Sequence, residues 1–283
     1  MDPQAYWERI KKLTIEAGQT ALRLINNNIP SIKGDHSVVT TADKAIAQLA
    51  HEQLADLLKT PDHILIEEED PQMHTYLNQS LLEKTPYLWS IDPIDGTRLY
   101  ANGIPYFAVS IGLLKNLRPW MGAVYFPRLN ELFYCDGQKA FFVQHPFTAS
   151  EQKMEIVPRE EEITYKSIFL SNDKNFRDYS WDYRNCQILI SGCASVDLCW
   201  PAIGRSCGAT FKSCLWDFAG SWPIFEAAGL KLRAIQSGRV LEELHIDLVE
   251  GNDKPWRVKD YYILSSEKNF SVLKKKLEFK NNF

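Results

Sequence analysis

Acidic residues at three separate places in the chain could together hold a metal ion. A run of four acids at 67–70 follows a short apolar segment, Asp92 and Asp95 follow the strand-like segment 87–91, and Asp217 precedes a further apolar segment. Two carboxylates three residues apart can share a turn and point at one ion, and carboxylate oxygens suit hard cations, magnesium above all. The sequence therefore favours a magnesium site if these places meet in the fold.

Each acidic segment also has a simpler interpretation. The motif Asp92-Pro93-Ile94-Asp95-Gly96-Thr97 could be a surface turn, because Asp, Pro and Gly are turn residues. The run at 67–70 could be a solvated stretch of charge, and Asp217 could be the N-cap of a helix. Each feature is weak by itself, so the question is whether they belong together.

Composition limits the classes of protein that the chain can represent. It has 283 residues with 45% hydrophobic content, enough for one large domain or two smaller ones with a sizeable core. The net charge of -4, from 32 basic and 36 acidic residues, gives no electrostatic footprint for nucleic acid. The basic stretch Lys274-Lys275-Lys276 with Lys280 is better explained as a solvated helix face.

Targeting signals and soft-metal motifs are not evident. No segment has the 18 or more apolar residues of a membrane helix, and the N-terminus does not resemble a signal peptide, so a cytoplasmic protein that binds no membrane is expected. The six cysteines form no C-x-x-C motif and are interpreted as thiols. The six histidines are scattered and form no H-x-x-x-H motif, so the sequence argues against a zinc site.

Hydrophobic periodicity predicts helices before strands in the first half. Helices are expected over 5–26 and from about Thr41 to Pro61. Six strand-like runs follow and predict a largely antiparallel sheet flanked by the helices, at 63–66, 87–91, 107–114, 121–125, 131–135 and 140–143.

A polar, acidic stretch at 146–165 is the candidate boundary between two halves, 1–152 and 153–283. The first half is then α+β. In the second half strands alternate with helices, which is typical of an α/β fold, with strands at 167–170, 187–190 and 261–264 and helices at 195–203 and 217–228.

The order and spacing of these segments resemble the inositol monophosphatase superfamily of metal-dependent, lithium-sensitive sugar and nucleotide phosphatases. Two separated signatures carry the resemblance, Trp89-Ser90-Ile91-Asp92-Pro93-Ile94-Asp95-Gly96-Thr97 and Trp216-Asp217-Phe218-Ala219-Gly220. Supporting matches lie at Lys33, 39–43, 105–112, 122–127, 191–195 and 226–229, so that the likeness runs from about residue 5 to residue 265.

The resemblance implies a fold and an activity. The fold is the layered αβαβα sugar-phosphatase architecture, with the metals between an α+β half that carries most ligands and an α/β half that carries Asp217. The activity is that of a phosphoric monoester hydrolase, in which metal-activated water attacks a small soluble phosphomonoester, inositol monophosphate or a similar polyol phosphate. Family members are commonly homodimers, and many are inhibited by lithium.

The resemblance also assigns metal ligands. One magnesium would bind Glu68, Asp92 and the carbonyl of Ile94, and a second would bind Asp92, Asp95 and Asp217. A third, weaker magnesium would use Glu68 through water. Because three glutamates stand in a row, Glu67 remains an alternative to Glu68.

Catalytic and substrate-binding roles follow in the same way. Thr97 and Glu68 would orient the attacking water, and Asp43 would hydrogen-bond Thr97. Phosphate oxygens would meet the backbone N–H groups of Gly96 and Thr97. The substrate's hydroxyls would contact Asp95 and the loop Gly192-Cys193-Ala194, although Cys193 could equally be a small buried apolar residue.

Two departures from the family pattern bear on specificity. The first signature continues with Arg98-Leu99, beyond the metal ligands. Inositol-specific members carry a Glu seven residues before the second-signature Asp, where this chain has Thr210, and Lys212 stands nearby and could bind substrate. A 3'(2'),5'-bisphosphate nucleotidase and a sugar bisphosphatase therefore stay open as alternatives. So does a non-catalytic protein that binds metal or phosphate.

Overall fold

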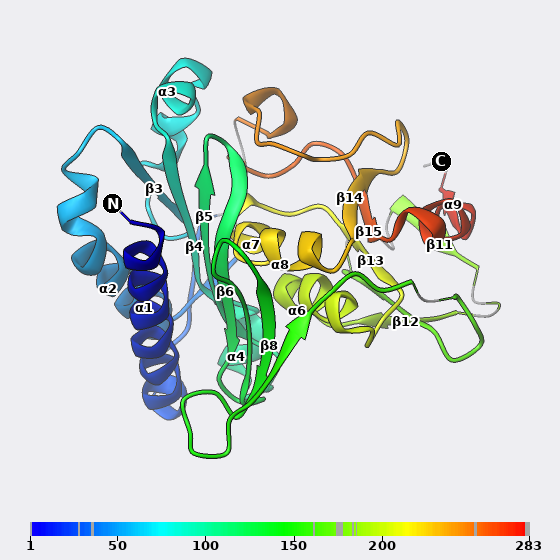
Figure 1. Cartoon of the computed structure of the whole chain (residues 1–283), viewed down its shortest axis with the longest axis horizontal. Coiled ribbons are helices and arrows are strands. Elements are labelled where there is room, and N and C mark those ends of the chain that lie inside the picture. The colour runs from blue at the N-terminus through cyan, green and yellow to red at the C-terminus, as the bar shows by residue number, and fades with distance from the viewer. Residues whose placement is uncertain are drawn as a thin grey trace.

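The fold consists of five layers, in which helices and two sheets alternate (Figure 1). It was obtained as a computed structural model. The structure describes residues 2–27, 29–34, 37–160, 162–173, 178–182, 184, 186–251 and 254–280. Within that part, the layers are a helix pair, a seven-stranded sheet, short helices, a five-stranded sheet and an outer helix. The expected αβαβα architecture is therefore confirmed.

The first layer consists of α1 (Pro3–Leu24) and α2 (Thr41–Leu58), as the periodicity predicts. The buried residues of α1 recur every three or four positions and form one stripe, because 3.6 residues make a turn. Helix α2 begins with a capping box, in which Thr40 and Asp43 each bond the other's backbone. This cap buries Asp43 at the start of the helix.

The first sheet has the order β3-β4-β5-β6-β7-β8-β9, in which only β3 and β4 are parallel. Its strands are β3 (His63–Glu67), β4 (Tyr87–Asp95), β5 (Ala108–Lys115), β6 (Arg118–Phe126), β7 (Glu131–Cys135), β8 (Ala140–Gln144) and β9 (Gln152–Ile156). Most of β3 to β7 is buried on both faces because helices cover both sides. The prediction of a largely antiparallel sheet is confirmed.

The middle layer places α7 directly against the first sheet. It contains α6 (Ala194–Cys199), α7 (Leu215–Ala219) and α8 (Trp222–Ala227), between the two sheets (Figure 1). A Cβ on Gly112 would lie 2.4 Å from the carbonyl carbon of Ala219, and one on Gly122 would lie 2.2 Å from the oxygen of Gly220. Only glycine allows this approach, which brings Asp217 of α7 to the sheet.

The second sheet has the order β12-β10-β13-β15-β14, parallel at β12-β10-β13 and antiparallel beyond. Its strands are β10 (Ile168–Ser171), β12 (Gln187–Ile190), β13 (Gly208–Phe211), β14 (Lys231–Ala234) and β15 (Tyr262–Ser265). Helix α9 (Glu267–Lys275) covers the outer face and buries Leu273 beside Phe169 and Ile263.

The remaining described elements are short. Two are two-stranded ribbons, β1 (Ser31–Ile32) with β2 (Val38–Val39) and β11 (Tyr179–Trp181) with β16 (Leu277–Phe279). The others are helices, namely α3 (Gln79–Lys84), α4 (Thr97–Ala101) and four 3₁₀ turns.

Two expectations about local structure are wrong. The helix expected over 217–228 is two helices, because Pro223 lacks the N–H that would continue α7. Asp92 and Asp95 lie within β4 rather than in a turn after it. The polar stretch 146–165, for which the sequence predicted no strand or helix, contains β9, whose mostly exposed residues pair with β8 at a sheet edge.

The division of the chain into halves at 152/153 stays a prediction. The proposed boundary falls at the start of β9, and one hydrophobic cluster includes residues of both sheets, such as Ile66 and Leu264.

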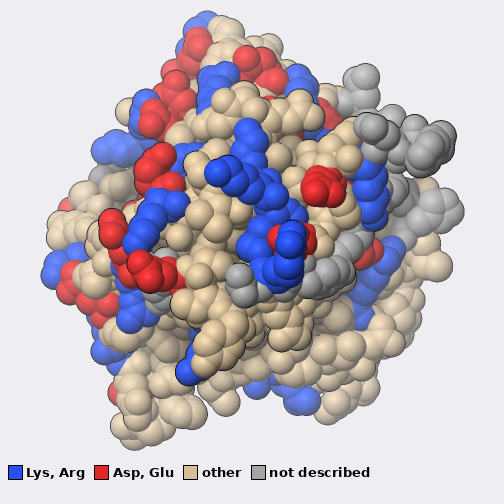
Figure 2. Space-filling view, turned by 90° about the vertical axis from the view of Figure 1, so that its right-hand side faces the viewer, with Lys and Arg blue, Asp and Glu red and all other residues tan. Residues whose placement is uncertain are grey.

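Charges of both signs share the face that carries the second sheet. Lys and Arg gather near its centre, and Asp and Glu lie among and around them (Figure 2). The basic C-terminal stretch occupies the last turn of α9 and the residues after it. All six cysteines are free thiols, as expected. No helix in the described ranges is long and apolar enough to cross a membrane.

Candidate active site

Strand β4 directs two carboxylates to one place because its regular pairing is interrupted. Residues i and i+3 of a regular strand point to opposite faces. The register between β4 and β5 shifts between Asp92 and Asp95, and such an irregularity re-aims side chains. Both carboxylates are buried and approach each other.

Helix α7 supplies the third carboxylate. Asp217 lies in its first turn and accepts hydrogen bonds from the backbone N–H of Cys214 at 2.8 Å and from the Ser213 hydroxyl. Oxygens of Asp92, Asp95 and Asp217 all lie within 4.8 Å of one another. Across the described parts of the chain, this is the one group of three metal-ligand side chains that meets that distance.

The protein's own hydrogen bonds leave part of this cluster unsatisfied. The carboxylate of Asp95 accepts from the N–H groups of Ala194 (3.1 Å) and Ser195 and from the thiol of Cys193 (3.2 Å). The Oδ1 atom of Asp92 is buried and has no hydrogen-bond partner among the residues that the structure describes. A buried carboxylate oxygen without a partner is costly, and a cation coordinated by this atom would remove that cost.

Burial and mutual repulsion raise the pKa values of these acids. Burial raises the pKa of Asp217 to about 6, and the charge of Asp95 adds to the effect. The pKa of Asp92 lies well above its ordinary value, through burial and then through the charges of Glu68 and Asp95. Without a cation, deprotonated carboxylates this close together repel one another near neutral pH. A divalent cation among them offsets that repulsion.

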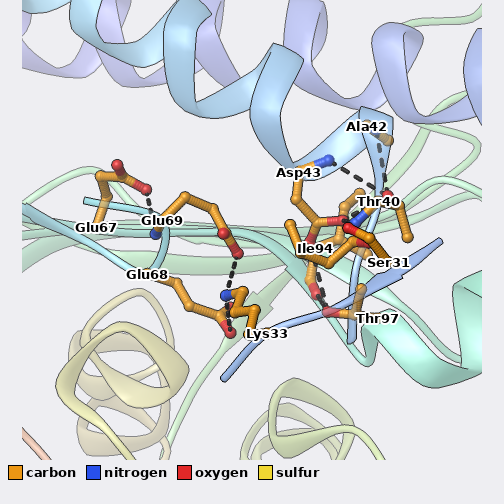
Figure 3. Close-up of polar contacts among 11 residues, drawn as sticks. Ser31, Lys33, Thr40, Ala42, Asp43, Glu67, Glu68, Glu69, Ile94 and Thr97 are labelled. Atoms are coloured by element: carbon orange, nitrogen blue, oxygen red, sulfur yellow. Dashed lines mark hydrogen bonds and ion pairs between the residues drawn. The ribbon is translucent and has the colours of Figure 1, made fainter. Parts of the chain in front are cut away.

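The two candidate glutamates point in different directions (Figure 3). Glu67 is the last residue of β3 and is buried; its carboxylate accepts from the N–H of Glu69 at 2.7 Å and lies 3.5 Å from Nε2 of His51. Glu68 lies 3.4 Å from Nζ of Lys33 and lines the same cleft as Asp217. The geometry therefore favours Glu68 as the ligand.

Electrostatics point the same way. Burial raises the pKa of Glu68 to about 8; the Lys33 ammonium opposes this rise, and the charge of Asp217 adds to it. Glu68 therefore interacts electrostatically with the carboxylate cluster to which Asp217 belongs.

Replacing each glutamate by its isosteric amide tests this choice. Glu68→Gln should lower kcat/KM at least about a hundredfold, because a lost metal ligand removes about 3 kcal/mol of transition-state stabilisation. Glu67→Gln should lower it less than tenfold. Steady-state phosphate release with magnesium titration measures both, and only Glu68→Gln should raise the magnesium concentration needed for half-maximal rate. The reverse order of effects would assign the ligand to Glu67.

The hydroxyl of Thr97, the last residue of the first signature, contacts Asp43 and the carbonyl of Ile94 (Figure 3). Its hydroxyl lies 2.9 Å from the Ile94 carbonyl oxygen and 3.4 Å from Oδ1 of Asp43. Gly96, just before, has φ 85°, and a Cβ there would lie 2.9 Å from the Tyr106 carbonyl. Glycine is thus required at the entry to α4.

Two cavities flank Asp217. We call the larger the metal cleft, with a volume of about 450 Å³; Lys33, Glu68 and Lys254 line it. The smaller is the inner cavity, of about 160 Å³, and all the residues expected to contact substrate except Gly96 and Thr97 line it, namely Asp95, Gly192, Cys193, Ala194 and Lys212.

Sequence reasoning missed three residues of the site. Ser213 donates to Asp217, and its position four residues earlier, at a helix start, was an available signal. Lys254 lines the metal cleft and Asp197 lines the inner cavity, without a sequence signal for either. Thr210 is buried and its hydroxyl lies 2.7 Å from that of Ser171.

Comparison with known proteins identifies relatives over most of the chain. The model of the inositol monophosphatase family matches residues 4–269. The fructose-1,6-bisphosphatase/inositol-1-monophosphatase of Aquifex aeolicus (strain VF5) is 29% identical over 206 residues, which cover 70% of this chain and 72% of that protein.

Solved structures share the fold. Staphylococcal IMPase-I complexed with products has a TM-score of 0.75 at 18% identity and covers 100% of both chains. An IMPase/NADP phosphatase complexed with Mg²⁺ and phosphate also has a TM-score of 0.75 at 18% identity, and the match covers 99% of this chain and 97% of that one.

Proposed function

This chain belongs to the inositol monophosphatase family, and from that premise we propose that it is a magnesium-dependent phosphatase of small soluble phosphomonoesters. The observation that carries the proposal is the convergence of Asp92, Asp95 and Asp217, whose carboxylate oxygens all lie within 4.8 Å of one another. Phosphoryl transfer to water needs positive charge at the phosphate oxygens, and three converging carboxylates are a means of holding it.

The donor set fits magnesium. The proposed ligands are carboxylates and one carbonyl, which hard cations prefer, and the buried Oδ1 of Asp92 has no partner within the described part of the chain. We assign Glu68, Asp92 and the Ile94 carbonyl to one ion and Asp92, Asp95 and Asp217 to a second, with a third ion near Glu68. When bound, magnesium supplies charge neutralisation at the phosphate and activates the attacking water.

The protein's own groups position the reactants. Thr97 and Glu68 orient the water, and Asp43, fixed by the N–H of Thr40 at 2.8 Å, orients the Thr97 hydroxyl. The N–H groups of Gly96 and Thr97 hold phosphate oxygens. Lys33 neutralises part of the acidic charge through its contacts with Glu68 and Glu69.

The inner cavity receives the leaving group in this proposal. Asp95 and the loop Gly192–Ala194 face it and accept or donate to hydroxyl groups, as suits inositol monophosphate or a similar polyol phosphate. Cys193 donates to Asp95, and burial raises the pKa of its thiol, so it remains a donor. Thr210 offers a hydroxyl where inositol-specific relatives offer a carboxylate.

A second candidate is a bisphosphatase of the same fold, acting on a sugar or a nucleotide. Lys212 in the inner cavity favours it, because an ammonium there can meet a second phosphate. A homodimer in the cytoplasm that binds neither nucleic acid nor membrane stays a prediction.

Phosphate release from a panel of polyol, sugar and nucleotide phosphates, with and without magnesium, tests the proposed function. We expect magnesium-dependent turnover of at least one member. Binding of phosphate without turnover of any member would instead identify a non-catalytic binding protein.

A further inference from the structure

Asp95 is held in place by the loop that leads into α6. Each of three successive residues of that loop donates to its carboxylate, namely the thiol of Cys193 at 3.2 Å, the N–H of Ala194 at 3.1 Å and the N–H of Ser195. These donors lie 98 to 100 residues from Asp95 along the chain. The direction of the Asp95 carboxylate therefore depends on the shape of a distant loop, and whatever fixes that loop also fixes Asp95.

A buried hydroxyl closes this loop. The Ser191 Oγ accepts a hydrogen bond from the N–H of Cys193 at 3.1 Å and lies 2.9 Å from the Cys193 carbonyl oxygen. Gly192, between them, has φ 76°, a left-handed conformation that favours glycine. The Ser191 hydroxyl thus spans a tight turn, and that turn aims the donors that follow it at Asp95.

The Ser191 hydroxyl is itself held by Asp197. Its Oγ lies 2.7 Å from Oδ1 of Asp197, a residue of α6 that is only 3% exposed. Burial raises the pKa of Asp197 well above the ordinary value of an aspartate; the Ser191 contact opposes this rise, and the charge of Asp95 adds to it. A buried acid needs a partner to offset its desolvation, and Ser191 is such a partner.

A count of hydrogens favours a protonated Asp197. The Ser191 hydroxyl carries one hydrogen, but two oxygens lie within hydrogen-bond distance of it, the Cys193 carbonyl oxygen and Oδ1 of Asp197. If Asp197 keeps its proton, its O–H donates to Ser191, and the Ser191 O–H donates to the Cys193 carbonyl. Both contacts are then hydrogen bonds, and Asp197 holds the turn without placing a charge beside Asp95.

We propose that Asp197, acting through Ser191, is a positioning residue for the metal-binding carboxylate of Asp95. The inference rests on the proposed function, because the direction of Asp95 matters in this way only if a cation binds there. Hydrogen bonds around a metal-binding carboxylate orient it, and their loss typically weakens metal affinity or activity about 10- to 100-fold. Asp197 reaches Asp95 through the loop rather than directly, so the effect of its removal should lie at the lower end of this range.

The test is the dissociation constant of magnesium, measured by isothermal titration calorimetry at one pH. Ser191→Ala and Asp197→Ala should each raise it about tenfold. Asp197→Asn should keep it within threefold of the wild type, because the amide of asparagine can donate to Ser191 as the protonated acid does. A purely structural role would lower the unfolding temperature of the metal-free protein and leave the dissociation constant unchanged.

A double variant and a control separate this contact from general loss of packing. Ser191→Ala combined with Asp197→Ala should raise the dissociation constant no more than either change alone, because both residues act through one contact; independent effects would multiply to about a hundredfold. Thr14→Val is the control. The Thr14 hydroxyl is also buried and donates to a carbonyl, that of Ile10 at 2.8 Å, but in α1. This variant should bind magnesium as the wild type does.

Failure of the inference and failure of the proposed function give different results. If the wild type binds magnesium and Ser191→Ala binds it equally well, the inference alone is overturned; the same holds if Asp197→Asn is as impaired as Asp197→Ala. Ser191→Ala removes a single oxygen, so it carries the test even if Asp197→Ala does not fold. If the wild type neither binds magnesium nor releases phosphate from any substrate, the proposed function is wrong and the inference with it.

Discussion

Asp92→Asn should lower kcat/KM at least about a thousandfold and at the same time stabilise the protein in the absence of metal. The loss of rate follows because Asp92 is the proposed ligand of two ions, whose combined effect is several kcal/mol, at 1.36 kcal/mol for each factor of ten. The gain in stability follows because one of several repelling, buried carboxylates is removed. Phosphate release measures the first effect, and thermal unfolding in excess chelator measures the second.

In addition, magnesium should no longer raise the unfolding temperature of the Asp92→Asn variant. Asp62→Asn, a change at an exposed position outside the site, is the control and should alter neither quantity. An Asp92→Asn protein that is inactive but less stable than the wild type without metal would mean that Asp92 supports the fold rather than a cation.

Removal of divalent cations should abolish activity and leave a protein whose stability falls as the pH rises from about 4 to 8. The pKa of Glu68 is raised from 4.5 to about 8 and that of Asp217 from 3.8 to about 6. Between these limits the folded chain holds protons that the unfolded chain has released. Each such proton lowers the unfolding free energy by about 1.4 kcal/mol per pH unit, or a few °C in Tm.

Magnesium should reverse this trend, because it binds the deprotonated carboxylates. Its stabilising effect should therefore grow from pH 5 to pH 8. Thermal unfolding across this range, with chelator and with saturating magnesium, measures both slopes. The His51 imidazole also lowers stability as the pH rises, because Glu67 raises its pKa. The Glu68→Gln variant keeps this contribution and loses that of Glu68, so the difference between variant and wild type reports on the carboxylate cluster. A magnesium effect of equal size at both pH values would contradict the assignment.

Helices with a clear hydrophobic period or clear capping residues could be predicted from local sequence alone. The apolar stripe of α1 and the capping residues of α2 specify those helices through neighbouring residues alone. The strands β13 and β14 were missed because they are short and largely buried on both faces, which removes the alternation that reveals a strand. Strand β9 was missed for the opposite reason, since its residues are mostly exposed at a sheet edge.

By itself, the sequence determined which carboxylates form the cluster, since Asp92, Asp95 and Asp217 stand in two signatures whose order is specific. Only the tertiary structure decided how they converge. The register shift in β4 turns Asp95 toward Asp92, and the glycine contacts of β5 and β6 bring α7 close enough for Asp217 to join them.

The choice between Glu67 and Glu68 likewise lay outside the sequence. Three identical residues in a row carry no periodicity, and a shift of one position reverses the direction of a side chain at a strand end. Packing favours Glu68, because His51 and the Glu69 N–H contact the carboxylate of Glu67, whereas Glu68 faces Lys33 and the cleft. The cavities that surround Lys212 are also products of packing, since segments far apart in the chain form their walls.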